Sequence, residues 1–385
     1  MEKKVVRVAV IINDFVVGGV AAVALGILRN TPKNSVQYTF IKGSDYTCDA
    51  DDEIKKQGHS IFTLPKRKPM RCSVFSLWAN DFRKSNDILK ILKQTGPFDA
   101  IHIHDFPFPG ILAAKRAKIP VRILHSHLST SEFYGGENES KITALFLKIR
   151  QKVYKNLANC YAGTSLKACH AMFGENAFLK HREPTVINPG LNLERFNMQK
   201  HTAEESHNTF PSEENAIRLV HTGRFVGVKN QSFILDIVAS LKQKNVSCEL
   251  FLVGSGELED TLKKKTRELQ IEQLVHFLPP DTNTPLLMRG SDFFLLPSFS
   301  EGFGLVLTEA QAMGLRCIVS DTISTETDAG LITYLPIGNT AELWVDTIIM
   351  LHNIPAPVPD MKKLESFDVK HMAENVIRIY QNNKG

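Results

Sequence analysis

The 385-residue sequence lacks any apolar stretch near the ~20 residues that a membrane-spanning helix requires. It also lacks internal repeats and low-complexity tracts. A signal peptide is not expected, because residues 1–12 have the pattern of a first β-strand. The six cysteines contain no C-x-x-C pair, which argues against a disulfide framework or a cysteine zinc site. We therefore expect a cytoplasmic protein with reduced thiols.

The net charge is only +5, but the two halves of the chain differ in sign. Residues 1–200 contain 30 Lys and Arg against 17 Asp and Glu, and the remaining residues contain 16 against 24. The first half is therefore expected to meet an anionic partner. Nucleic acid is not expected, since no helix-turn-helix, RNP or zinc-finger pattern accompanies the charge. A peripheral contact with an anionic membrane surface, or an acceptor that carries phosphate, fits better.

The basic and aromatic segment 66–82 is the candidate for the membrane contact, although its aromatic residues could instead pack on the domain, which we favour. A polar, glycine-bearing loop at 129–138 is a candidate lid on the acceptor side.

Apolar, β-branched runs alternate with helical patterns along the chain, which predicts parallel sheets with crossover helices. The runs are mostly continuous, as in strands covered by helices on both faces. A polar stretch at 197–215 separates two series of strands, so we expect two doubly wound α/β domains, 1–196 and 197–369. The expected strands are 5–12, 37–41, 60–64, 100–104, 122–125, 160–163 and 185–188 in the first domain, and 218–223, 249–253, 275–277, 293–297 and 317–320 in the second.

The most informative segment is 297–305, with Glu301 and, eight positions later, Glu309. Strand residues run into a turn that contains Gly302 and Gly304, and a helical pattern follows. Ligands of open α/β sheets bind beyond the carboxyl ends of strands, and free amides at a helix start attract phosphate oxygens. Eight residues of helix span ~12 Å. The two carboxylates are therefore expected to hold different parts of one extended ligand, such as a nucleotide-sugar.

Two cations, Arg224 and Lys229, follow the strand that ends at Gly223. They could neutralise a diphosphate, since Arg offers a planar fork and Lys a mobile point charge. Alone, they could equally be solvated loop cations.

The sequence S-E-G-F-G-L-V-L-T-E-A at 300–310 resembles the paired-glutamate motif of the retaining family-4 glycosyltransferases, and G-R-F-V-G-V-K-N at 223–230 resembles their phosphate-binding segment. The resemblance implies the GT-B fold, in which two Rossmann-like domains face a central cleft. It also implies that a terminal helix at about 370–385 packs back on the first domain. The bacterial branch that builds capsular or exopolysaccharide units is the most similar one.

The resemblance assigns roles to individual residues. Glu309 would bind the ribose hydroxyls and Glu301 the hydroxyls of the donor sugar, although an acid in a first helical turn also favours the helix dipole. Arg224 and Lys229 would bind the diphosphate. The other donor-side positions implied are Gly18, Gly19, Gly254, Phe277, Phe303, Gly304 and Leu305. Pro279-Pro280 departs from the glycine usual in the family, which leaves the nucleobase open.

Four histidines lie at the ends of two expected strands: His102, His104, His125 and His127. His127 best matches the histidine of the family's catalytic region, with His104 as the second choice. An H-x-H pattern can also indicate a metal, but no carboxylate or cysteine cluster completes a site, so none is expected. The D-x-D at Asp49–Asp51 has the letters of a metal motif of another fold, but we interpret it as a solvated loop.

These features together predict a retaining hexosyltransferase that uses a nucleotide-sugar, by preference a UDP-sugar, without a metal or other cofactor. The acceptor would be a saccharide, with a lipid-linked one as an open alternative. A nucleotide-sugar epimerase of the same architecture and a catalytically silent partner subunit remain as alternative functions.

Overall fold

The computed structural model describes residues 5–15, 19–66, 74–127, 149, 152–153, 155–174, 184–338 and 340–381. The chain divides into two compact units. The first comprises Met1–Gly190 together with Val369–Gly385, and the second comprises Leu191–Asp368. Both are α/β, and each is described by itself below.

The first unit contains a seven-stranded sheet in the order β3-β2-β1-β4-β5-β6-β7. Every neighbouring pair is parallel. The order reverses at β1 and β4, the switch point at which doubly wound folds place their ligands. The strands are β1 (Val6–Ile12), β2 (Val36–Lys42), β3 (Ser60–Thr63), β4 (Ala100–Ile103), β5 (Val121–Ser126), β6 (Cys160–Gly163) and β7 (Thr185–Val186).

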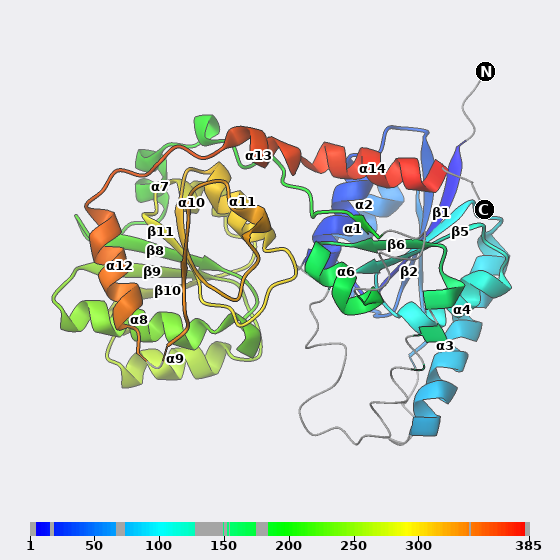
Figure 1. Cartoon of the computed structure of the whole chain (residues 1–385), viewed down its shortest axis with the longest axis horizontal. Helices are drawn as coiled ribbons and strands as arrows, with labels where there is room; N and C mark the ends of the chain where they lie inside the picture. The colour runs from blue at the N-terminus through cyan, green and yellow to red at the C-terminus, as the bar shows by residue number, and fades with distance from the viewer. Residues whose placement is uncertain are drawn as a thin grey trace. The chain divides into compact units, whose positions relative to one another are not determined.

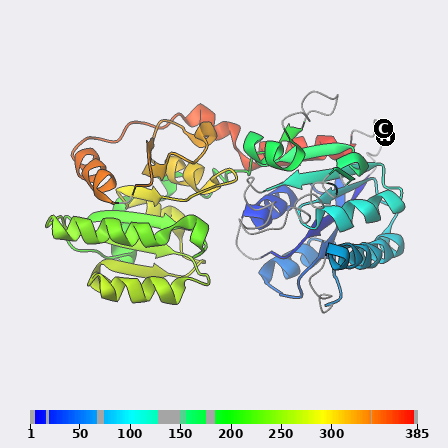
Figure 2. The same cartoon turned by 60° about the horizontal axis from the view of Figure 1, so that its bottom comes forward.

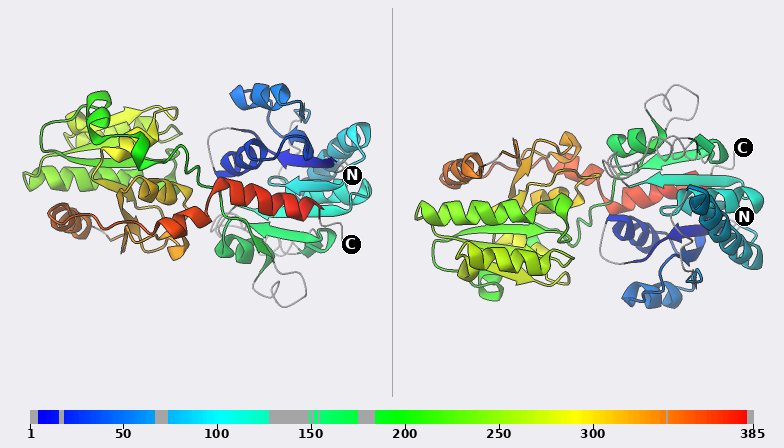
Figure 3. Two further views of the ribbon diagram at one scale, coloured as in Figure 1. Left: turned by 90° about the horizontal axis from the view of Figure 1, so that it is seen from above. Right: turned by 90° about the horizontal axis from the view of Figure 1, so that it is seen from below.

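Alternate residues of β1 explain the two layers of helices in the first unit. Val8, Val10 and Ile12 face one core, and Ala9 and Ile11 face the other. Helices α1 (Gly19–Arg29), α2 (Asp49–Lys56) and α14 (Val369–Gln381) pack in the first core, and α3 (Val74–Thr95), α4 (Pro107–Arg116) and α6 (Leu166–Phe173) pack in the second. The terminal helix α14 therefore belongs to the first unit, beside α1 (Figure 1 and Figure 3).

The second unit contains a six-stranded parallel sheet in the order β10-β9-β8-β11-β12-β13. Its strands are β8 (Ile217–Thr222), β9 (Cys248–Val253), β10 (Val275–Leu278), β11 (Phe293–Leu296), β12 (Arg316–Ser320) and β13 (Ile332–Leu335). The last strand was not expected from the sequence. Each of its residues is only partly buried.

Helices cover both faces of the second sheet (Figure 1 and Figure 2). One core joins the sheet to α8 (Gln231–Gln243), α9 (Glu259–Glu268) and α12 (Glu342–His352), and the other joins it to α10 (Thr284–Arg289), α11 (Leu305–Ala312) and α13 (Met361–Ser366). The unit also contains α7 (Ala203–Thr209) and the 3-10 turns η3 (Met198–Lys200), η4 (Gly227–Lys229), η5 (Glu272–Leu274) and η6 (Thr325–Thr327).

The polar stretch 197–215, which separates the two series of strands, lies within the second unit and forms η3 and α7 there. Side-chain caps explain why so polar a segment is helical. Asn197 caps η3 through the amide of Gln199, and Thr202 caps α7 through the amide of Glu205. Among the described helices, none is long and apolar enough to cross a membrane.

Candidate functional site

The loop after β8 is held against the loop after β9 by backbone contacts. The amide of Gly223 donates to the carbonyl of Val253 (3.0 Å), and that of Phe225 donates to Ser255 (2.8 Å). A Cβ atom on Gly254 would lie 2.0 Å from the Gly223 carbonyl oxygen, and Gly254 has a φ of +150°. Here the glycine is required for contact between two loops. That Gly254 also lines a ligand pocket stays a prediction.

Lys229 and Glu301, which are 72 positions apart in sequence, form an ion pair. The Lys229 Nζ donates to both carboxylate oxygens, at 2.7 and 2.8 Å. The two side chains are only 19% and 11% exposed. Thus the structure brings together one residue predicted to bind the diphosphate and one predicted to bind the donor sugar, and these two residues contact each other directly.

Backbone and side-chain contacts join the segments that carry this pair. The amide of Phe299 donates to the Val228 carbonyl (2.9 Å), and Asn230 Nδ2 donates to the Pro297 carbonyl (3.2 Å). Asn230 has a positive φ of 54°, which Asn tolerates better than most residues. The segments that follow β8 and β11 therefore form one joined structure at the carboxyl edge of the sheet.

A buried layer that the sequence did not indicate lies behind Lys229. His221 Nδ1 donates to the Leu295 carbonyl (2.8 Å), which leaves Nε2 to accept from the Gln231 amide (3.2 Å). Gln231 Nε2 also donates to the carbonyl of Arg224 (2.8 Å), whose side chain is exposed. Burial and the nearby Lys229 charge lower the pKa of His221 to about 4. No spacing rule links these residues, so only the fold reveals them.

The helix α11 begins directly after Gly304, which has a positive φ of 79°. The first amides of a helix lack the usual intrahelical partner, so those at the very start of α11 can donate to a ligand, whereas the Leu307 amide already donates to the Gly304 carbonyl (2.8 Å). The side chain of Phe303 is buried and packs on Phe367, with ring centroids 5.3 Å apart. Only its backbone can therefore serve the predicted phosphate contact.

Glu309 lies on α11 and is partly buried. Burial raises the pKa of its carboxyl to about 7, although the positive charge of Arg195 acts in the opposite direction. At neutral pH this acid is thus poised between its two forms. The sequence did not identify Arg195.

Phe277 is partly buried against Phe225, with ring centroids 6.1 Å apart, and Lys263 Nζ lies 5.4 Å from the centre of its ring. It thus packs on the same loop that carries Arg224.

The predicted residues of the first half lie in the first unit. Gly19 starts α1, and His127 follows β5. Gly18, the loop 129–138 and residues 67–73 of the basic and aromatic segment lie outside the described residues. The described Lys66 pairs with Asp45 at 2.7 Å, so part of that positive charge is already offset.

The four strand-end histidines form two hydrogen-bonded pairs. His102 Nε2 lies 3.0 Å from His125 Nδ1, and His104 Nδ1 lies 2.8 Å from His127 Nε2. The pairs stack, with centroid distances of 4.1 Å between His102 and His104 and 4.3 Å between His125 and His127. Tyr380 of α14 completes the network, since its hydroxyl lies 2.7 Å from His102 Nδ1.

Burial keeps these imidazoles neutral. It lowers the pKa of His127 to about 3, and that of His102 to about 3 with a smaller contribution from His127. The pKa values of His104 and His125 also lie well below the usual range, mainly because of burial. A neutral His127 can donate or accept a hydrogen bond, but it offers no positive charge.

One nitrogen each of His102, His104 and His125 lies within 4.8 Å of the others, which is close enough to consider a shared metal ion. The ring planes argue against coordination. The planes of His102 and His125 are nearly parallel, at 7°, and Nε2 of the first lies 3.0 Å from Nδ1 of the second, as in an N–H···N hydrogen bond. A tetrahedral ion needs lone pairs that converge on one centre. The arrangement therefore fits a hydrogen-bond network better.

The interpretation of Asp49–Asp51 as a solvated loop was wrong. These residues start α2, and Asp51 is buried in an ion pair with Lys42 at 2.5 Å. A carboxylate paired in this way is engaged with a cation of the protein itself. The D-x-D letters thus mark a buried structural contact.

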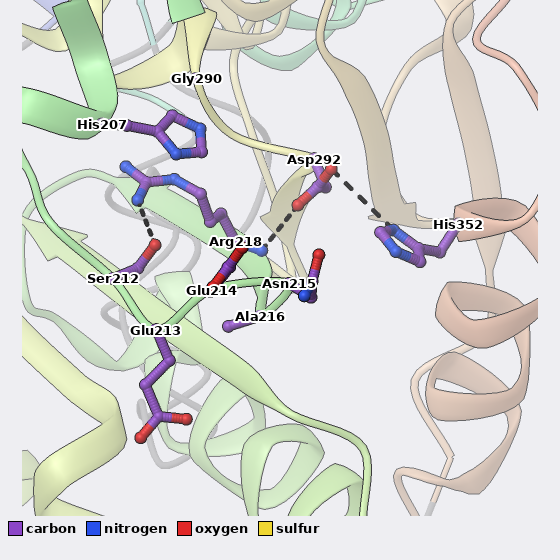
Figure 4. A pocket seen from close by; sticks show the side chains of 10 residues that line it. All are labelled: His207, Ser212, Glu213, Glu214, Asn215, Ala216, Arg218, Gly290, Asp292 and His352. Carbon is purple, nitrogen blue, oxygen red and sulfur yellow. Dashed lines mark hydrogen bonds and ion pairs between the residues drawn. The ribbon is translucent and has the colours of Figure 1, made fainter. Parts of the chain in front are cut away.

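A cavity of about 560 Å³ lies at the amino ends of β8 and β11, the edge opposite to the Lys229–Glu301 pair (Figure 4). Its buried Arg218 donates to Ser212 and to the Phe210 carbonyl and lies over the ring of Phe251. The acids Glu213, Glu214 and Asp292 also line it, which makes it a poor host for an anion. None of the predicted site residues lies there.

The chain belongs to the glycosyl transferases of group 1. The model of that family matches residues 202–329, which include the Arg224, Lys229, Glu301 and Glu309 positions. EpsF of Bacillus subtilis (strain 168), a protein named as a glycosyltransferase, is 31% identical over 346 residues, which cover 89% of this chain and 86% of EpsF. This chain is thus a glycosyltransferase, and its two units are the two Rossmann-like domains of the GT-B fold.

Solved structures agree with this fold. HepE (Alr3699) of Anabaena, crystallised with UDP and glucose, has a TM-score of 0.72 at 15% identity, with 98% of this chain and 99% of that one covered. WaaG, described as a glycosyltransferase involved in lipopolysaccharide biosynthesis, has a TM-score of 0.67 at 16% identity, with 97% and 100% covered. At such identities the likeness shows the fold alone.

Proposed function

We propose that this protein is a retaining hexosyltransferase that moves a hexose from a UDP-sugar to a saccharide acceptor in the synthesis of a surface polysaccharide, without a metal ion. The observation that carries this proposal is the Lys229–Glu301 pair at the carboxyl edge of the second sheet, with Arg224 on the same loop and Glu309 on the adjoining helix. HepE, which has this fold, was crystallised with UDP and glucose, and WaaG takes part in lipopolysaccharide biosynthesis. Both support the proposed donor and pathway by likeness.

The chemistry would be a substitution at the anomeric carbon of the donor. The bond from that carbon to the diphosphate breaks, a bond to the acceptor oxygen forms on the same face, and the acceptor proton passes to the departing diphosphate. Arg224, Lys229 and the amides at the start of α11 would stabilise the charge that develops on the diphosphate. His127 would hold the donor sugar by a neutral hydrogen bond. No nucleophile of the protein is required.

The test is a coupled assay of UDP release. Purified protein is incubated with UDP-hexoses, with and without saccharide acceptors, after a thermal-shift screen of UDP-, GDP- and ADP-sugars has ranked the donors. Acceptor-dependent release of UDP and a product with the donor's anomeric configuration are expected. An isomerised donor without acceptor would instead identify an epimerase, and donor binding without turnover would favour a silent subunit.

The double variant Arg224→Ala/Lys229→Ala should lose donor binding. Lys244→Ala is the matched control, because it removes an exposed cation of the same unit that pairs with Asp346.

The membrane contact of the basic first half is a separate part of the proposal. Flotation with vesicles of anionic or zwitterionic lipid tests it directly. Binding to the anionic vesicles alone, weakened by salt, is expected. Equal recovery with both kinds of vesicle would contradict it.

A further inference from the structure

The sequence pattern gives Glu301 a role at the donor sugar, but in the structure its carboxylate contacts Lys229. Both oxygens accept from the one Nζ, at 2.7 and 2.8 Å. A lysine ammonium has three N–H donors. The carboxylate occupies one side of the ammonium, so at least one N–H is left for a ligand.

The surroundings hold this arrangement before any ligand arrives. Phe299 and Asn230 join the segments on which the two side chains stand, through hydrogen bonds of 2.9 and 3.2 Å. The pair is mostly shielded from solvent, so the ammonium has few competing partners. A lysine side chain that is already ordered loses less conformational entropy when a ligand binds.

The layer below restricts the pair further. A Cβ on Gly223 would lie 3.4 Å from His221 Nε2 and 3.6 Å from Lys229 Cε, so the lysine stem and the buried imidazole both lie beside this residue without a side chain. The hydrogen bonds of His221 use one nitrogen as donor and the other as acceptor, as in a neutral ring. Glu301 is thus the group that both orients Lys229 and offsets its charge.

We infer that Glu301 is a positioning residue for the diphosphate, which it affects through Lys229. The inference rests on the proposed function, because it needs a nucleoside diphosphate as ligand. It differs from a contact with the donor sugar in one respect: the effect of Glu301 is present when the ligand is a nucleoside diphosphate that carries no donor hexose.

The experiment is a double-mutant cycle on UDP affinity, measured by isothermal titration calorimetry of the full chain. Glu301→Gln keeps the shape but removes the charge and replaces one acceptor oxygen by an NH2 donor. We expect it to weaken UDP binding by about 10-fold, and Lys229→Met to weaken it by about 30-fold. The double variant should bind UDP as Lys229→Met does, because Glu301 acts only through the lysine.

Controls separate this result from a loss of folding. Asp346→Asn breaks an exposed ion pair of the same unit, 2.5 Å from Lys244, and should leave UDP affinity unchanged. Glu301→Asp keeps the charge on a shorter side chain and should recover part of the affinity, and thermal unfolding of every variant checks its fold.

Three results would overturn the inference: UDP binding by Glu301→Gln that equals or exceeds that of the parent, no recovery by Glu301→Asp, or a further 10-fold loss when Glu301→Gln is added to Lys229→Met. Failure of the parent protein to bind any nucleoside diphosphate would instead remove the proposed function itself.

Discussion

At the carboxyl edge of the second sheet the polar side chains are charged and paired, whereas at that of the first sheet they are neutral imidazoles stacked on one another. Lys229 and Glu301 are close enough to offset each other's charge. His104 and His127 share a single hydrogen bond, and burial holds the pKa of both rings below the physiological range. Each arrangement avoids an uncompensated buried charge, but by a different route.

This difference suggests different tasks for the two units. The lysine ammonium of the ion pair keeps an N–H for a ligand. It can therefore bind an anionic diphosphate, since its positive charge favours that ligand. A neutral imidazole suits the uncharged hydroxyls of a sugar. The predictions below test this division, from the largest expected effect to the smallest.

Removing the cations of the second unit should have the largest effect. Arg224→Ala and Lys229→Ala should each reduce kcat/KM by ~10- to 100-fold, because a charge-assisted hydrogen bond contributes ~1.5–3 kcal/mol. Steady-state assays of UDP release measure it. Unchanged kinetics in the double alanine variant would contradict this division of tasks, because the cations at the carboxyl edge of the second sheet would then take no part in the reaction.

In the first unit, His104→Asn should lower kcat by about 20-fold, because His127 loses the partner that orients its Nε2. UDP affinity should stay the same, since the diphosphate contacts are assigned to the second unit. Kinetics and calorimetry on one preparation separate the two effects. His59→Asn, a histidine of the same unit that accepts from the amide of Tyr38, is the control. Weaker UDP binding by His104→Asn would show that the first unit also contributes to UDP affinity.

The sequence predicted the central strands of the two sheets well because they are buried on both faces. Such strands consist of continuous apolar runs, which are visible without any structure. The partly buried edge strand β13 escaped detection, whereas the more exposed edge strands β3 and β7 were expected from the sequence. The helices of 197–215 escaped it because polar caps rather than an apolar face mark them.

The candidate site likewise has features that the sequence could indicate and features that only the fold reveals. Glu301 and Lys229 stand in motifs that resemble those of the family, so the sequence could propose both as site residues. That they contact each other depends on how two loops 72 positions apart are joined, which no local pattern encodes. Asp51 is the opposite case, because an acidic triplet looked solvated until the fold placed Lys42 beside it.

The charge of Glu309 should depend on pH within the physiological range, because burial raises its pKa to about 7. Ribose hydroxyls need the carboxylate as acceptor, so affinity for a UDP-hexose should fall by about 8-fold between pH 7.5 and 6. Calorimetry across this range measures it. A UDP-hexose is the right probe, since its diphosphate, unlike that of UDP, has no proton to lose there. Glu309→Gln should flatten the profile, and a slope that survives in this variant would contradict the assignment.

The same raised pKa has an opposite consequence for stability. Between the ordinary pKa of a carboxyl and pH 7, the native state holds a proton that the unfolded chain has lost. Its contribution to the free energy of unfolding is therefore full at low pH and declines as pH rises through this window. Urea unfolding of the parent protein and of Glu309→Gln at pH 5 and pH 8 isolates this contribution.

A chelator should have the smallest effect, none on the rate of transfer. In the proposed mechanism Arg224 and Lys229 stabilise the leaving diphosphate, so no metal ion is needed there. Stacked, hydrogen-bonded imidazoles must break their N–H···N contacts before an ion can enter between them. Activity is measured after dialysis against EDTA and again after addition of Mg²⁺ or Zn²⁺. If EDTA lowers the activity, if Zn²⁺ restores it, and if the His125→Asn variant responds to neither, the histidine network of the first unit is a metal site. The carboxyl edge of the first sheet would then hold a metal ion, and that of the second sheet the cationic side chains of Arg224 and Lys229.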